Sequence, residues 1–208
     1  MSAVRRATLV AMSMLCASLA YAQTPPPSQP PAQPQARGNA RAAMRVMTLT
    51  TSAFADGGAI PTKHAQMGRD VSPALSWIGA PDSTRAFVLI VHDADAAIGD
   101  GTDDMLHWMV WNIPGTTTSL PEGMPQGAQS ANGMRQVSGT GPYYRGPAAP
   151  SSGPAHHYMF ELYALDAMIN VPAVGMAVPA TRAAVMAAIA AHIRGKGVLV
   201  GLYRRPAP

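Results

Sequence analysis

Three stretches of the chain place acidic, imidazole or aromatic side chains beside loops rich in glycine and proline. They are residues 72–77, residues 92–97 with 106–108, and residues 146–150 with 156–158. Loops that a rigid sheet holds in place carry a large share of the binding and catalytic residues of proteins. These stretches are therefore the candidates for a functional site.

The adjacent residues His156 and His157 lie in a segment whose alternating side chains are typical of a β-strand. Successive side chains of a strand point to opposite faces, so the two rings cannot readily bind one metal ion together. Tyr158 shares the face of His156. His107 lies in an apolar strand next to Trp108, and on its own such a residue is most often a buried neutral imidazole bonded to a carboxylate.

Two carboxylates, Asp93 and Asp95, follow an apolar segment at the point where the chain leaves the core. Aspartate often accepts hydrogen bonds from backbone N–H groups in turns, and one of the two can have that role alone. One face of the protein can then gather His107, His156, Tyr158 and one carboxylate.

Such a group of side chains supports three kinds of chemistry. Imidazoles, a tyrosine hydroxyl and backbone N–H groups can donate hydrogen bonds to an anion, while the carboxylate fixes a tautomer. Two histidines and a carboxylate can also bind a metal ion. A histidine could act as a base in ester hydrolysis, although the chain has no Gly-x-Ser-x-Gly motif and Ser72 precedes a proline, as turn residues do. The residues alone leave all three open.

Residues 1–22 have the pattern of a secretory signal peptide. Arg5 and Arg6 precede a short apolar run that ends in Ala-Tyr-Ala at residues 20–22, and the run is too short to span a bilayer comfortably. We expect cleavage, no transmembrane segment afterwards, and a periplasmic or secreted protein. A twin-arginine signal and a lipid anchor at Cys16 are the alternatives. Cys16 is the only cysteine, so the mature chain would have no disulfide and no thiolate metal ligand.

Residues 23–43 are expected to form a Pro-rich disordered linker, because six prolines lie there among Gln, Ser and Ala without apolar periodicity. A single folded domain then covers residues 44–208. The net charge falls from +4 to +2 once the two signal arginines are removed. The remaining positive residues are scattered and no basic stripe contains aromatic residues, so we expect no nucleic-acid partner.

Five segments of the domain have strand character: residues 44–51, 86–92, 106–113, 156–165 and 198–203. Only residues 179–194 have a convincing helical pattern, with Val185, Ala188 and Ile189 at helical spacing. Strands and helices do not alternate, which argues against a doubly wound parallel sheet. Residues 114–155 are rich in Gly, Pro, Ser and Gln, and we expect mostly loop there.

Taken together, these stretches resemble the phosphatidylethanolamine-binding (Raf-kinase-inhibitor-like) family, particularly its bacterial branch. The family's first signature, Asp-Pro-Asp-x-Pro followed by His-Trp and a strand ending in Asn-x-Pro, corresponds to Asp93-Ala-Asp95-Ala-Ala97, His107-Trp108 and Asn112-Ile-Pro114. The second signature, Gly-Pro-x-x-Pro followed by His-Arg-Tyr, corresponds to Gly146-Pro147-Ala-Ala-Pro150 and His156-His157-Tyr158. The match runs in order over residues 46–204.

The resemblance implies a mainly β fold of two packed, predominantly antiparallel sheets with one or two peripheral helices. It also implies a small cavity for phosphate, phospholipid head groups or carboxylates, with no metal and no cofactor. At the matching positions seven residues would line that cavity: Asp93, Asp95, His107, Pro147, Pro150, His156 and Tyr158.

Three positions depart from the family pattern, because two of its prolines are Ala94 and Ala97 here and its arginine is His157. From the resemblance we expect an exported ligand-binding protein with an anion pocket. One alternative is an inhibitor or interaction protein that acts on a hydrolase or kinase, as some relatives do. A second alternative is a hydrolytic enzyme that uses His107 or His156, and we favour binding over catalysis.

Overall fold

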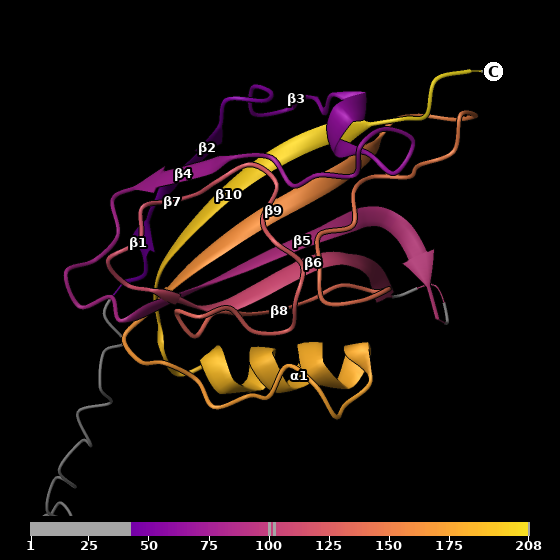
Figure 1. Cartoon of the computed structure of the whole chain (residues 1–208). Coiled ribbons are helices and arrows are strands. Elements are labelled where there is room, and N and C mark those ends of the chain that lie inside the picture. Colours follow the sequence, from indigo (N-terminus) through magenta and orange to yellow (C-terminus); the bar gives the residue numbers. More distant parts are fainter. Residues whose placement is uncertain (1–42, 100, 102, 208) are drawn as a thin grey trace, which may run out of the picture. The chain divides into compact units, whose positions relative to one another are not determined.

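The computed structural model describes residues 43–99, 101 and 103–207 (Figure 1). The expected signal peptide and all but the last residue of the expected linker lie outside the described residues. Within the described part of the chain, no helix is long and apolar enough to cross a membrane.

The described residues form short and long strands with two helical segments: β1 (Arg45–Val46), β2 (Thr48–Thr51), β3 (Gly58–Ala59), the 3₁₀-helix η1 (Thr62–His64), β4 (Leu75–Ile78), β5 (Ala86–Ile98), β6 (Asp103–Pro114), β7 (Ser119–Leu120), β8 (Arg135–Val137), β9 (His156–Leu165), α1 (Val178–Ile189) and β10 (Ile193–Tyr203).

The strands make two sheets. The larger has the order β1-β10-β9-β5-β6-β8, and β3 also pairs with β10. Its long strands β10, β9, β5 and β6 are antiparallel neighbours, whereas β1 and β3 run parallel to β10. The smaller sheet, β2-β4-β7, is antiparallel. Figure 1 shows the small sheet on one face of the large one and α1 on the other. The expected mainly β fold of two packed sheets is confirmed.

Strand β5 shows how one strand supports both layers. Phe87 and Leu89 belong to the core that also contains residues of the small sheet, whereas Val88 and Ile90 belong to the core that contains Val185 of α1. Side chains of a strand alternate between faces, so a strand buried on both sides is apolar at every position. The continuous apolar run in the sequence has this physical origin.

The predicted helix was too long at its C-terminal end. It was expected over residues 179–194, but α1 ends at Ile189 and β10 already begins at Ile193. Residues from Ile193 onward pair with β9, and Gly195 pairs with Arg45 of β1. Backbone pairing with two neighbouring strands thus overrides the helical spacing at the end of the segment.

Candidate functional site

A cavity of about 1290 Å³ lies where β5, β6 and β9 meet the loop before β9 and the beginning of α1. Five of the seven residues that the sequence comparison proposed line it: Asp93, His107, Pro150, His156 and Tyr158. Asp95 and Pro147 do not. The structure therefore brings five of the seven proposed residues together in one cavity and places the other two outside its wall.

Asp93 organises one wall of the cavity from a buried position with 3% exposure. Its Oδ1 accepts hydrogen bonds from the backbone N–H groups of Asp95 at 3.0 Å and Ala96 at 3.1 Å, which is the turn-capping role expected for one of the two acids. Nδ1 of His156 lies 2.9 Å from Asp93 Oδ2 and 3.2 Å from Oδ1. The carboxylate accepts from Nδ1–H, so Nε2 of His156 is the ring nitrogen left for a ligand.

A β-bulge turns His107 toward the same cavity. Val91 pairs with Trp108 and His92 pairs with Leu106, so His107 is an additional residue in β6 with no partner of its own in β5. Strict alternation would place His107 on the face opposite Trp108, but a bulge re-aims the side chain. The His107 ring meets the Tyr158 ring edge-on, with centroids 5.1 Å apart.

The buried His107 ring is neutral at pH 7. Its Nδ1 lies 2.9 Å from the backbone carbonyl oxygen of Arg145, which can only accept, so Nδ1 carries the proton. Burial lowers the pKa of His107, and the Arg145 carbonyl and the Asp93 charge oppose that shift only in part. The His107 ring thus bonds to a backbone carbonyl, whereas a carboxylate partner was expected. The other ring nitrogen, Nε2, carries no proton and can accept a hydrogen bond.

Tyr158 lies in the wall of the cavity and is buried. It pairs directly with Asp93 across β9 and β5, so the two side chains share one face of the sheet. The Tyr158 hydroxyl oxygen accepts hydrogen bonds from the N–H groups of Ala148 at 3.3 Å and Ala149 at 3.1 Å. Burial and the nearby Asp93 carboxylate raise the pKa of Tyr158 well above its usual value, so the residue remains a neutral phenol.

The Gly-Pro loop before β9 is pressed against the segment that follows η1. A Cβ on Gly146 would lie 2.1 Å from the carbonyl oxygen of His64, which explains the need for glycine. The Gly146 N–H donates to Asp70 Oδ1 at 2.6 Å, and the Pro147 carbonyl accepts from the backbone N–H of Gln66 at 3.1 Å. Pro147 is buried, and the two residues that follow it, Ala148 and Ala149, line the cavity.

Asp95 lies outside the cavity because it is bonded to His157. Its Oδ2 accepts from the backbone N–H of His157 at 2.6 Å and lies 2.8 Å from His157 Nδ1, and both side chains are exposed. The backbone bond from His157, followed by its ring, lowers the pKa of Asp95 despite partial desolvation. His156 and His157 thus bond to different carboxylates on opposite faces, as strand alternation predicts.

The sequence interpretation missed Arg145 and Gln66, which also line the cavity. Arg145 Nη2 donates to Gln66 Oε1 at 2.9 Å, and Gln66 Nε2 donates to the Gly146 carbonyl at 2.8 Å. No ion pair in the described part of the chain includes Arg145. The sequence signal that could have identified Arg145 was its position directly before the Gly-Pro motif.

This arrangement is suited to holding a negatively charged group. Arg145 supplies a permanent charge, His107 and His156 each present Nε2, and Tyr158 supplies a phenol. Among the residues that the structure describes, no three His, Asp or Glu side chains are grouped as metal ligands would be. Hydroxyl groups in the cavity wall belong to Thr140 and Tyr158, and the phenol is held in its neutral form.

Two packed sheets with a cavity beside the strand ends are the architecture of a β protein with a ligand-binding fold. The family model described as phosphatidylethanolamine-binding protein matches residues 50–204, and the chain belongs to this family. The resemblance seen in the sequence motifs is thereby confirmed.

Relatives from archaea and bacteria match most of the domain. A UPF0098 protein of Methanothermobacter thermautotrophicus is 38% identical over 162 residues, which cover 76% of this chain and 99% of that protein. The UPF0098 protein YbhB of Escherichia coli is 37% identical over 130 residues, covering 58% of this chain and 78% of YbhB. A relative from Mycobacterium tuberculosis, named as a candidate lipoprotein, LppC, is 32% identical over 164 residues, covering 77% of this chain and 74% of LppC.

Solved structures show the same fold. Escherichia coli YbcL is described as a member of the mammalian phosphatidylethanolamine-binding protein (PEBP) family. It has 25% identity and a TM-score of 0.63, with 76% of this chain and 98% of YbcL covered. The PEBP homologue CT736 of Chlamydia trachomatis has 29% identity and a TM-score of 0.59, with 77% of this chain and 98% of CT736 covered.

Proposed function

We propose that this chain is an exported ligand-binding protein whose cavity holds a small anionic group, either a phosphate, a phospholipid head group or a carboxylate. The observation that carries the proposal is Arg145, a guanidinium in the cavity wall that takes part in no ion pair among the described residues. Its charge acts on the His107 ring and helps to lower that ring's pKa. A cation beside two imidazoles attracts an anion.

The two histidines make binding dependent on protons. Nδ1 of His107 and Nδ1 of His156 are already bonded to Arg145 O and to Asp93, so each ring meets the ligand through Nε2. In the neutral ring this nitrogen accepts a hydrogen bond, and after protonation it donates one. An anion without a donor of its own therefore binds together with a proton, and its affinity rises as the pH falls.

Two observations support export. Residues 1–22 have the charged start, short apolar run and small-residue end of a signal peptide. The LppC relative of Mycobacterium tuberculosis is named as a candidate lipoprotein, a class of exported protein. A periplasmic or secreted location also suits a module that binds small ligands outside the cytoplasm.

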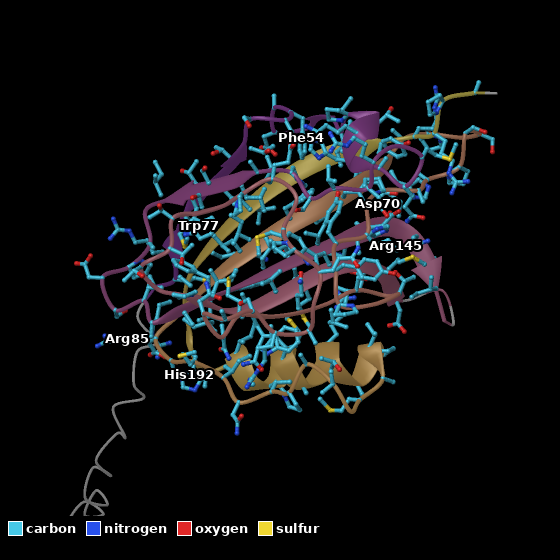
Figure 2. The ribbon with its side chains drawn as sticks, viewed as in Figure 1. Phe54, Asp70, Trp77, Arg85, Arg145 and His192 are labelled. Carbon is cyan, nitrogen blue, oxygen red and sulfur yellow. The ribbon has the colours of Figure 1, made fainter. Side chains whose placement is uncertain are left out.

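Calorimetric titration with inorganic phosphate tests the role of Arg145. Titration with acetate at two pH values well above the pKa of acetic acid tests the pH dependence, because acetate has no donor there. Arg145→Gln should weaken phosphate at least tenfold, because a charge-assisted hydrogen bond is lost. The control is Arg85→Gln, since Arg85 is exposed and Figure 2 shows it far from Arg145 in the view. Equal phosphate affinity for Arg145→Gln and the original chain, or tighter acetate binding at the higher pH, would overturn the proposal.

The two alternative functions give distinct results in parallel assays. Catalysis predicts turnover of an ester or phosphoester that is lost in a His107 variant. An inhibitor predicts a tight stoichiometric complex with a hydrolase or kinase that small anions do not disturb. Either result without phosphate binding would replace the proposed function.

A further inference from the structure

A second cavity, of about 520 Å³, lies between outer strands of the two sheets, and we call it the edge cavity. Strand β7 is an outer strand of the small sheet, and β8 is an outer strand of the large one. Residues of both strands line the edge cavity, together with Val110 of β6 and parts of the loop between β7 and β8. It shares no lining residue with the cavity of Arg145 and His107, so the two sites are separate. Its volume is in the range of small-ligand sites.

The edge of β7 that faces away from β4 has unpaired backbone groups at Ser119. The neighbouring pair, Trp77 and Thr118, is joined by a hydrogen bond from the Trp77 N–H to the Thr118 carbonyl at 2.9 Å. Hydrogen-bonded pairs of an antiparallel ladder alternate with pairs whose N–H and C=O groups point away from the partner strand. The N–H and C=O of Ser119 therefore point away from β4, and no described residue bonds to them. Ser119 lines the edge cavity, as do Thr117 and Pro121, so an open strand edge forms part of the wall.

The inner surface of the edge cavity is apolar. Val110 and Leu120 are buried members of the core between the sheets, and Met124 and Met134 are partly buried against that core. All four residues line the cavity. Methionine is unbranched and flexible, so it adapts to apolar groups of different shape. This surface is therefore suited to an apolar side chain of a ligand.

Two side-chain amides in the wall are available to a ligand. Gln126 and Gln129 line the edge cavity and are exposed, and neither amide is bonded to any residue that the structure describes. Gln136 is buried instead, and its Nε2 donates to the carbonyl oxygens of Pro125 at 2.7 Å and Gly127 at 3.0 Å. These bonds hold the segment that carries Gln126. An amide side chain both donates and accepts, as the peptide group of a ligand does.

The edge cavity offers no group for a charged ligand. Among the described residues that line it, only Arg135 is charged, and its Nη1 donates to the Val171 carbonyl at 2.9 Å. The occupant is therefore uncharged where it enters the cavity, in contrast to the anion of the proposed function.

We propose that the edge cavity binds an extended, uncharged peptide segment of another protein. The segment pairs with the open edge of β7 at Ser119 and directs an apolar side chain toward Met124 and Met134. Strand addition of this kind takes its affinity from backbone hydrogen bonds and its specificity from pockets for alternate side chains. Residues 23–42 of this chain fit less well, because the prolines there lack the N–H that the Ser119 carbonyl would accept. The site is independent of the proposed anion function.

A capped peptide of alternating threonine and leucine, Ac-Thr-Leu-Thr-Leu-Thr-amide, is the probe, titrated into the chain with NMR detection. The Ser119 amide proton should shift downfield as its hydrogen bond forms. Ser119→Pro removes this N–H and leaves the ladder to β4 intact, so it should weaken the peptide by about two- to tenfold. Ser119→Ala keeps the N–H and should bind like the original chain. The peptide methylated at every backbone nitrogen should bind more weakly to the unaltered protein, because it cannot donate.

The apolar part of the site is tested with a second pair of variants. Met124→Gln should weaken the peptide, because the surface that receives its leucine becomes polar. Met67→Gln is the control, since Met67 is 62% exposed and lies outside the wall of the edge cavity. Equal losses in the two variants would contradict the assigned surface.

Further outcomes separate this site from its alternatives. Saturating phosphate should leave the peptide affinity unchanged, and competition between them would place the peptide in the cavity of Arg145. No shift of the Ser119 amide at millimolar peptide, or equal affinity for Ser119→Pro and Ser119→Ala, would overturn pairing at β7. Tighter binding of a synthetic peptide with the sequence of residues 24–36 would assign the edge to this chain's own Pro-rich segment. A dimer that the threonine-leucine peptide dissociates would assign it to a second copy.

Discussion

A single additional residue in β6 decides which side of the sheet the His107 ring reaches. Without the bulge between Leu106 and Trp108, the ring would lie among the apolar side chains that face α1. With it, the ring lies edge-on to Tyr158 and its Nδ1 bonds to the Arg145 carbonyl. The same residue type two strands away, His157, lies on the exposed face. Local backbone geometry thus separates a pocket histidine from a surface one.

Alanine substitution of these two histidines should have unequal effects on anion binding. His107→Ala should weaken phosphate or acetate by about 1.5–3 kcal/mol, because a hydrogen bond that is charge-assisted in the bound state is lost. His157→Ala should change affinity little, since that ring is bonded to Asp95 outside the cavity. Calorimetric titration of both variants measures the difference. Losses of equal size would show that the ligand binds on the other face of the sheet.

A line of charged groups connects the long strands to α1. Glu161 of β9 lies 2.5 Å from Lys196 Nζ of β10 and accepts a hydrogen bond from the Tyr163 hydroxyl at 2.9 Å. His92 Nε2 of β5 is 3.6 Å from Glu161 Oε2, a distance that gives electrostatic attraction without a well-formed hydrogen bond. The other ring nitrogen of His92 faces Asp104 of β6, which binds Arg182 of α1. The line crosses the face of the sheet that α1 covers.

Acid should weaken the fold through Glu161. His92, Lys196 and Tyr163 lower the pKa of Glu161 to about 2 from an ordinary value of 4.5, although partial burial opposes the shift. A depressed folded pKa means that the stabilisation is complete above pH 4.5 and disappears as the pH falls toward 2. Glu161→Gln should lower the free energy of unfolding at pH 7 by about 1–2 kcal/mol, between the values for exposed and buried ion pairs.

Urea unfolding at pH 7, 4 and 3 measures this effect. The Glu161→Gln chain should lose less stability on acidification than the original chain does. The control is Glu122→Gln, because Glu122 forms a single exposed ion pair with Lys63 and should change stability little. A steeper acid loss in Glu161→Gln than in the original chain would be inconsistent with this role for the carboxylate.

For the molecule as a whole, two apolar cores on the two faces of one sheet provide stability within the described residues. One core lies between the sheets and the other under α1. Both consist of residues between Met47 and Tyr203. Within the described part of the chain, each face of the large sheet thus contributes to stability through its own apolar core.

Export predicts a defined N-terminus. Cleavage after Ala22 should leave material from the cell envelope that begins with Gln23-Thr24-Pro25, because residues 20–22 match the small-x-small pattern that signal peptidase recognises. N-terminal sequencing or intact-mass measurement checks this. Protein that starts at a lipidated Cys16 would show membrane anchoring instead, and an intact Met1 would exclude export by this signal.

The amino-acid sequence by itself determined the family and the mainly β fold, and it identified five of the residues that line the cavity. The bounds of β9 agree with the alternation at residues 156–165, and the apolar run of β5 correctly indicated burial on both faces. Such patterns are local: period-two alternation and apolar runs follow directly from the geometry of a strand. The short strands β3, β4, β7 and β8 escaped prediction, because two to four residues carry too little pattern to identify a strand without its partner.

Only the tertiary structure decided which charges meet. Asp93 and Asp95 are alike in the sequence, yet one bonds to His156 inside the cavity and the other to His157 outside it. The position of Arg145 in the cavity and the end of α1 at Ile189 likewise depend on contacts between segments far apart in the chain. These features arise from strand register, a bulge and packing across the sheet, and local residue order does not determine pairings of that kind.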